Sequence, residues 1–354
     1  MITVSSHSID RAVLAEKTDN TRNFLPQLRD LLPERPDLLA VYARRSIEFA
    51  AGIIALELAE DSIAWLRRSA RANALMFVSC AHPDQTSAIE LGDGTTLSVT
   101  LSVALSVDSP GDTSKAHAPA WIDAVWCAIA CDDAIAQSWL ATIDIETLRR
   151  TEIACNEYVF AYAALLKSLL TRDGRHVQWL TKAIEQCEPS PDLETTQDWI
   201  DHFDYPVLRA IYPLLADKTA DFNSALAELL ENHRDYWRRD EEKLGVQGLI
   251  SLPAIALARL AYARGMTVEV QSGYMPDIVW RTSSPATLSL CPYCVSPKPT
   301  IVNRCTLCGR DTSKDAPIEM TMLKLRAEKN KSCTRCGYPL HALANTCPSC
   351  RQRQ

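Results

Sequence analysis

The spacing of apolar residues along most of residues 1–280 is typical of α-helices. Apolar positions recur every three or four residues, with polar residues between them, which is the pattern of a helix that buries one face. The predicted helices are residues 38–58, 120–131, 156–170, 176–187, 205–215 and 220–242, with another that begins after Asp61. Asp61 suits a helix N-cap because its carboxylate can accept hydrogen bonds from the free N–H groups of the first turn.

A further helix is predicted at residues 249–263, where the apolar residues lie nearly all round the helix rather than on one face. Such a pattern indicates a helix buried in the centre of the protein. Pro253 falls near the start of this segment. We place it in the first helical turn, because a proline in the middle of a helix would cost about 3 kcal/mol.

One segment has the period of a β-strand instead. Apolar residues alternate with small polar residues from Leu97 to Val107, and residues 89–91 alternate in the same way before them. The pattern predicts a β-hairpin near residues 88–107 that turns at Asp93 and Gly94. An isolated hairpin is only marginally stable, so it must pack on helices or find a third strand. A second short strand is predicted at residues 267–270.

Length and composition predict two soluble domains. The chain has 354 residues, of which 47% are apolar and 23% charged, and this argues against a disordered protein. No apolar run approaches the roughly 20 residues that span a bilayer, and no secretory signal opens the chain, so we expect a cytoplasmic protein with no membrane contact. Residues 281–285 suit a linker between a helical body, residues 1–285, and a tail, residues 286–354.

The net charge of −7 is the sum of two unlike parts. Residues 291–354 contain 11 of the 37 basic residues and 4 of the 44 acidic ones, a formal charge of +7. The first 290 residues therefore carry a formal charge of −14. The acidic body is a poor match for nucleic acid but suits a basic protein partner. For the basic tail, nucleic acid remains an alternative.

The tail contains the spacing C-x₂-C-x₁₀-C-x₂-C twice. Two residues between cysteines allow both thiolates to reach one tetrahedral ion, so the pattern predicts two structural Zn²⁺ ions with four cysteine ligands each. The predicted ligands are Cys291, Cys294, Cys305, Cys308, Cys333, Cys336, Cys347 and Cys350. Four thiolates leave no open position for water, which argues against a catalytic zinc.

The pairing of these cysteines has two solutions. Short loops favour closure within each repeat, which would place the first four cysteines on one ion and the last four on the other. In the alternative, the first and last pairs share one ion and the middle pairs share the second. Over its whole length the tail resembles a double zinc ribbon, which implies small β-rich modules that hold partners.

The rest of the chain contains no recognisable catalytic motif, so we expect a binding protein and not an enzyme. Two acidic stretches, one of which includes a tryptophan, are candidates for binding a partner. One interpretation is a solvated helix face, and the other is a surface that binds a basic protein through aromatic anchors. The candidate residues are Asp198, Trp199, Asp201, Asp204, Asp240, Glu241 and Glu242.

Residues 242–280 read EKLGVQGLISLPAIALARLAYARGMTVEVQSGYMPDIVW. This stretch, an apolar helix followed by a short strand and Tyr274-Met275-Pro276, resembles the C-terminal part of immunity protein family 49 of bacterial polymorphic toxin systems. The resemblance covers roughly residues 20–280 and implies a mostly helical, non-enzymatic protein that neutralises a cognate secreted toxin. Because the body is acidic, we expect a basic toxin that acts on nucleic acid and whose active site is occluded.

The alternative function is a zinc-ribbon adaptor that binds nucleic acid or has a regulatory role. The basic residues of the tail motivate it. Aromatic residues that could stack on bases are sparse there, with only Tyr293 and Tyr338, which favours the immunity function.

Overall fold

The computed structural model of the chain describes the helical body and four short strands of the tail. The described residues are 1–58, 61–81, 86–91, 94–100, 116–150, 154–187, 195–239, 246–281, 288–290, 297–299, 330–332 and 339–341. Over this part of the chain the protein is mostly helical, as the sequence predicted.

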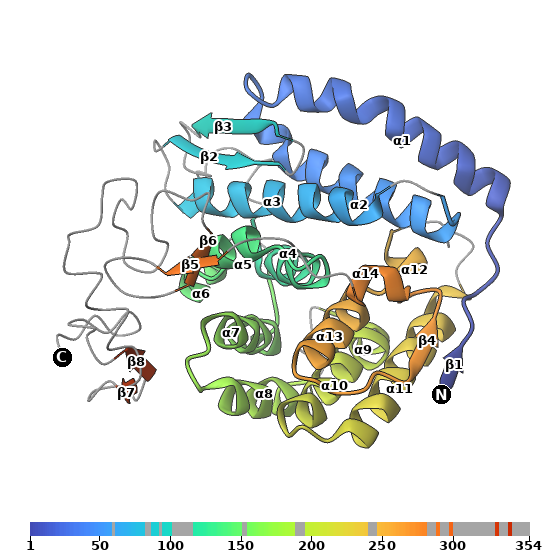
Figure 1. The fold of residues 1–354 in the computed structure, drawn as a ribbon, viewed down its shortest axis with the longest axis vertical. Coiled ribbons are helices and arrows are strands. Elements are labelled where there is room, and N and C mark those ends of the chain that lie inside the picture. The colour runs from blue at the N-terminus through green and yellow to red at the C-terminus, as the bar shows by residue number, and fades with distance from the viewer. Residues whose placement is uncertain are drawn as a thin grey trace.

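The first three long helices stack as successive layers at one side of the body (Figure 1). The outermost is α1 (Arg11–Leu31), which packs on α2 (Leu39–Ala55), and α2 packs on α3 (Ser62–Ala81). A 3₁₀ turn, η1 (Pro36–Leu38), joins α1 to α2. Asp61 accepts a hydrogen bond from the backbone N–H of Ala64 at 3.0 Å, which confirms it as the N-terminal cap of α3.

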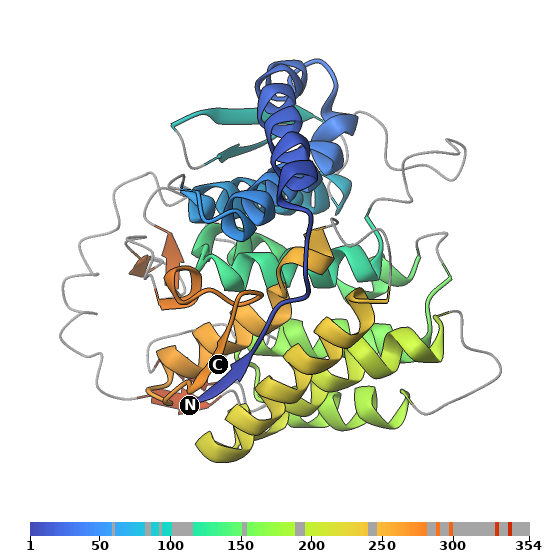
Figure 2. The same cartoon turned by 90° about the vertical axis from the view of Figure 1, so that its right-hand side faces the viewer.

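The next layers follow below α3 and include the helices predicted near residues 120, 156 and 176 (Figure 2). Here α4 packs against α3 and α7, and α7 packs against α8. The helices are α4 (Ala118–Ala130), α5 (Ala134–Leu140), α6 (Ile145–Arg149), α7 (Glu157–Thr171) and α8 (His176–Glu185).

The remaining helices close the other side of the body. They are α9 (Gln197–Trp199), the π-helical turn η3 (Ile200–Asp204), α10 (Tyr205–Leu215), α11 (Thr219–Trp237), α12 (Val246–Leu249), α13 (Leu252–Ala263) and α14 (Asp277–Arg281). As predicted, α13 is central: residues 254–258 are all buried, and the helix packs on α4 and α10. Pro253 lies in its first turn, where its missing N–H has no helical partner to lose.

The predicted hairpin is present as β2 (Thr86–Glu90) and β3 (Thr96–Thr100). The two strands are antiparallel, with Ile89 opposite Leu97, and both of these side chains are buried. The turn includes Gly94 at φ +82°, a conformation that favours glycine. The strand β2 lies against α3, which supplies the packing that a lone hairpin needs. Residues 92–93 and 101–107 lie outside the described residues.

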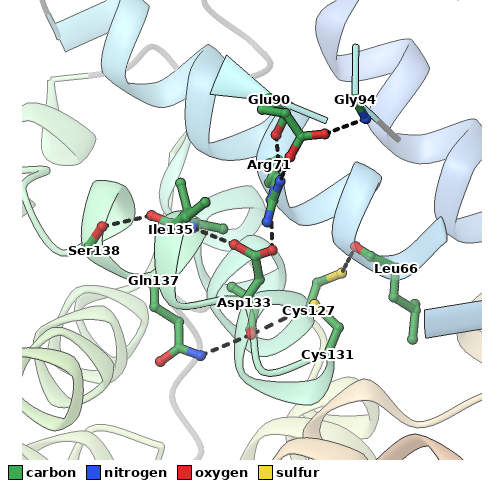
Figure 3. A network of polar contacts seen from close by, with 12 residues as sticks. Leu66, Arg71, Glu90, Gly94, Cys127, Cys131, Asp133, Ile135, Gln137 and Ser138 are labelled. Carbon is green, nitrogen blue, oxygen red and sulfur yellow. Dashed lines mark hydrogen bonds and ion pairs between the residues drawn. The ribbon is translucent and has the colours of Figure 1, made fainter. Parts of the chain in front are cut away.

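A buried arginine fixes the hairpin to the helices (Figure 3). Arg71 of α3 donates from Nε to Asp133 Oδ2 at 2.7 Å, and from one terminal nitrogen, Nη1, to both the backbone oxygen and the carboxylate of Glu90. Asp133 also caps α5, since its Oδ1 accepts from the N–H of Ala136 at 2.8 Å. One guanidinium therefore connects α3, the hairpin and α5.

A second small sheet joins the two ends of the body. The strand β1 (Ile2–Val4) pairs in parallel with β4 (Val270–Ser272), with Ile2 opposite Val270. The sequence predicted a strand in this region at residues 267–270, whereas the observed strand begins at Val270. Its N-terminal partner was not predicted, and neither was α1.

In the tail, β5 (Leu288–Leu290) pairs with β6 (Pro297–Pro299), and β7 (Asn330–Ser332) pairs with β8 (Pro339–His341), both antiparallel. The strand β6 lies against α5 of the body. Among the helices that the structure describes, none is both long and apolar enough to cross a membrane.

Candidate functional site

The acidic and aromatic stretch near residue 200 folds into an unusual turn. The short helix α9 begins after Thr196, whose hydroxyl accepts from the N–H of Trp199 at 3.3 Å. It continues directly into the π-helical turn η3 and then into α10. Single π-helical turns inside α-helices are rare and occur frequently at functional sites. Here the turn determines the direction in which each acidic and aromatic side chain points.

Two of the predicted residues, Asp198 and Asp201, form the exposed rim of this turn. Asp198 lies 3.2 Å from the guanidinium of Arg239 and 3.3 Å from Nδ1 of His202. Asp201 accepts a hydrogen bond from the side-chain amide of Gln197 at 2.8 Å. Within the part of the chain that the structure describes, Asp201 has no cationic partner. Its carboxylate is therefore available to form an ion pair with a basic side chain of another molecule.

The predicted residue Trp199 belongs to a larger group of rings that we call the aromatic cluster. Its members are Trp199, Phe203, His233, Tyr236, Trp237 and Tyr274. Trp199 stacks on Phe203 with 4.2 Å between the ring centroids, and Phe203 meets the edge of Tyr236 at 4.7 Å. The tryptophans, the phenylalanine and Tyr236 are half-buried, so these rings lie partly at the surface between η3 and α11.

The inner end of the aromatic cluster is buried. The ring of His233 lies 4.6 Å from that of Tyr274, and His233 is 3% exposed. Burial is the larger cause and electrostatic repulsion from the nearby His7 the smaller one, and together they lower the pKa of His233 to about 3. The Tyr274 hydroxyl lies 2.7 Å from Nδ1 of His7 and accepts from its backbone N–H at 2.7 Å. At neutral pH His233 is therefore an uncharged member of the cluster.

Asp204 differs from the other predicted residues because it points into the body. Its carboxylate accepts a hydrogen bond from the hydroxyl of buried Tyr158 at 2.8 Å, which ties η3 to α7. Burial raises the pKa of Asp204 to about 6. Asp204 therefore positions the turn and does not belong to its exposed rim.

The ring partners on α11 were missed by the sequence analysis. His233, Tyr236 and Trp237 are spaced by three and four residues, so they lie on one face of the helix. That spacing was visible in the sequence, but the position of this face against η3 depends on the tertiary fold. The predicted residues Asp240, Glu241 and Glu242 lie outside the described residues.

The eight predicted zinc ligands also lie outside the described residues. Within the described ranges, no group of three or more histidine, cysteine, aspartate or glutamate side chains is arranged to hold a metal ion. Burial raises the pKa of Cys131 and Cys187 in the body, which disfavours their reactive thiolate forms.

A family model, described as immunity protein 49, matches residues 55–278. The match covers more than half of the 354 residues and includes α3, α13, the π-helical turn and all six residues of the aromatic cluster. Comparisons with curated proteins and with solved structures gave no match. The matched range includes residues 242–278 of the stretch that carried the resemblance in the sequence. The chain belongs to the immunity protein 49 family.

Proposed function

We propose that this protein neutralises a cognate toxin by binding it through the exposed part of the aromatic cluster and the rim carboxylates Asp198 and Asp201. The observation that supports the surface is the partial exposure of four adjacent rings beside the Asp201 carboxylate, which has no cationic partner among the described residues. Tightly bound interfaces concentrate their energy in a few aromatic anchors surrounded by polar residues. Membership of an immunity family supports the class of partner.

The toxin is a basic protein that acts on nucleic acid, and binding occludes its active site. The formal charge of −14 on the first 290 residues supports a basic partner, because opposite net charges accelerate association. Enzymes that act on nucleic acid present basic surfaces to the phosphate backbone. An acidic immunity protein can cover such a surface and thereby exclude the substrate.

The test measures binding between the full chain and the purified toxin encoded beside its gene. We expect a complex of nanomolar affinity and rescue of growth when the two proteins are produced together. In the variant Trp199→Ala we expect at least a 30-fold loss of affinity, typical of an aromatic anchor. In Asp201→Lys we expect slower association, with a difference that shrinks as salt is added.

A matched control is Asp221→Lys, which makes the same charge change at an exposed aspartate at the opposite end of α11. Its affinity should stay within twofold of that of the unmodified protein. Far-UV circular dichroism of each variant checks that the helices are intact. Absence of any complex and of growth rescue would refute the function. A complex that neither Trp199→Ala nor Asp201→Lys weakens would refute the surface alone.

A further inference from the structure

One carboxylate of the proposed binding surface is already paired inside the protein. Asp198 of α9 lies 3.2 Å from Nη1 of Arg239, the second residue after α11, and both side chains are 55% exposed. The other terminal nitrogen of the same guanidinium, Nη2, lies 3.1 Å from Nε2 of His202 in η3. One guanidinium therefore contacts two groups that lie four residues apart on the segment that forms the rim.

His202 meets this guanidinium as a hydrogen-bond acceptor. Its Nδ1 lies 2.8 Å from the backbone oxygen of Asp198, and because that oxygen only accepts, Nδ1 carries the proton. In the neutral imidazole Nε2 is then the acceptor, which suits a guanidinium because every polar hydrogen of that group is a donor. Asp198 and His202 together present two acceptors to the two terminal nitrogens of one guanidinium. This forked geometry favours a guanidinium over the compact ammonium group of lysine.

The two acceptors also border the aromatic cluster. The ring of Tyr236 lies 5.7 Å from that of His202 and 5.9 Å from that of Trp199, so one ring contacts both. The imidazole of His202 is mostly buried, and its position is therefore fixed from the side of the protein. A partner that covers Trp199 would also reach Asp198, the residue directly before it.

The guanidinium that occupies this position is weakly held. An ion pair between two exposed side chains contributes little to stability, because water solvates both groups and pairing restricts a long side chain. Displacement of Arg239 into solvent therefore costs little. At the same time, a positive charge on the rim repels a basic partner as long as it stays there.

From this geometry we infer that Asp198 and His202 form a binding subsite for a guanidinium group, which Arg239 fills in the free protein and an arginine of the toxin fills in the complex. The exchange preserves the ion pair at Asp198 and moves the charge of Arg239 away from the incoming arginine. The exchange rests on the proposed function, whereas the subsite itself does not.

The first experiment tests the subsite without the toxin. Arg239→Ala empties it, and Arg238→Ala is the matched control, because it removes the same charge from an adjacent exposed residue that lies 3.5 Å from Asp235 instead. Methylguanidinium is titrated into each full-length variant at constant ionic strength, and the ring protons of His202 are followed by NMR. We expect a saturable shift in Arg239→Ala, with a dissociation constant on the order of tens of millimolar. In Arg238→Ala binding should be at least fivefold weaker, because Arg239 still occupies the subsite.

Methylammonium serves as the probe for charge alone. It should bind Arg239→Ala at least fivefold more weakly than methylguanidinium does, because it cannot donate to both acceptors in the forked geometry. The subsite is overturned if methylguanidinium causes no saturable shift of His202 in Arg239→Ala. Equal binding of the two probes, or equal binding of methylguanidinium by the two variants, overturns it as well. Far-UV circular dichroism checks that each variant has folded.

The second experiment tests the exchange with the purified toxin. Arg239→Ala should bind it about threefold to fivefold more tightly than Arg238→Ala, because no internal cation competes for the subsite. An affinity equal to or below that of the control overturns the exchange. If the unmodified protein forms no complex with the toxin, the proposed function and the exchange both fail, and the methylguanidinium titration still decides the subsite.

Discussion

Replacement of His233 by phenylalanine should change how the stability of the body depends on pH. His233 is 3% exposed and lies among the rings of Phe203 and Tyr274. Burial and His7 lower its pKa from 6.5 to about 3, so the folded protein keeps this imidazole neutral in mild acid. Phenylalanine fills a similar volume with a ring that does not titrate.

The sign of the effect follows from proton binding. Below pH 6.5 His233 binds a proton in the unfolded chain, whereas in the folded chain it stays neutral until the pH approaches 3. Acid therefore favours the unfolded state. The stability contributed by the neutral imidazole is complete above pH 6.5 and is lost as the pH falls toward about 3. The full effect is about 5 kcal/mol, at 1.36 kcal/mol for each pH unit. Between pH 7.5 and 5.0 the loss is about 2 kcal/mol.

Urea unfolding followed by far-UV circular dichroism at pH 7.5 and 5.0 measures this loss. The difference in unfolding free energy between the unmodified protein and His233→Phe should shift by about 2 kcal/mol between the two pH values, in favour of the variant at pH 5.0. Trp237→Phe is the control, because it alters a neighbouring ring that cannot titrate. The reasoning is refuted if the pH profiles of His233→Phe and the unmodified protein are parallel.

Three other substitutions test the packing of the body. Arg71→Met should lower the unfolding free energy by about 3–5 kcal/mol, because it leaves a buried carboxylate unpaired, and Asp133→Asn in the same chain should recover part of that loss in a double-mutant cycle by urea unfolding. Gly52→Ala should lower the thermal midpoint, since a Cβ there would overlap the Thr18 hydroxyl, and combination with Thr18→Ala should restore it. Asp204→Asn should gain stability relative to the unmodified protein as the pH rises from 4 to 7, because the carboxyl, with its pKa raised to about 6, opposes folding only when charged. Urea unfolding of both proteins at pH 4 and pH 7 checks the last prediction. It is refuted if the difference in urea midpoint between Asp204→Asn and the unmodified protein is the same at the two pH values.

Elements that depend on local sequence were predicted well. The start of α3 follows from one capping carboxylate, and the burial of α13 follows from its apolar composition. The first helix, α1, was missed because its buried face is narrow: only Leu14, Thr18, Leu25 and Leu28 are buried among 21 residues. Such a helix is stabilised by its packing on α2, which a periodicity argument within one segment does not include.

Features that depend on distant residues could not be predicted. The pairing of β1 with β4 joins strands of three residues from opposite ends of the body, and three residues give too short a pattern to recognise. The acidic stretch shows a different failure. Asp201 and Asp204 are three residues apart, so an α-helix would place them on the same face. The π-helical turn separates them, and Asp201 remains exposed whereas Asp204 bonds to Tyr158.

The folding unit of the body is larger than the range that the family model matches. The match begins at residue 55, yet α2 and α1 before it bury Tyr42, Phe49 and Leu25 in the common core. The N-terminal segment also completes the region around the aromatic cluster, because β1 pairs with β4 and His7, which follows β1, bonds to Tyr274. A fragment that starts at residue 55 would expose these apolar surfaces and leave β4 without its partner strand. The N-terminal segment therefore contributes to the proposed toxin-binding surface by holding its inner rings in place.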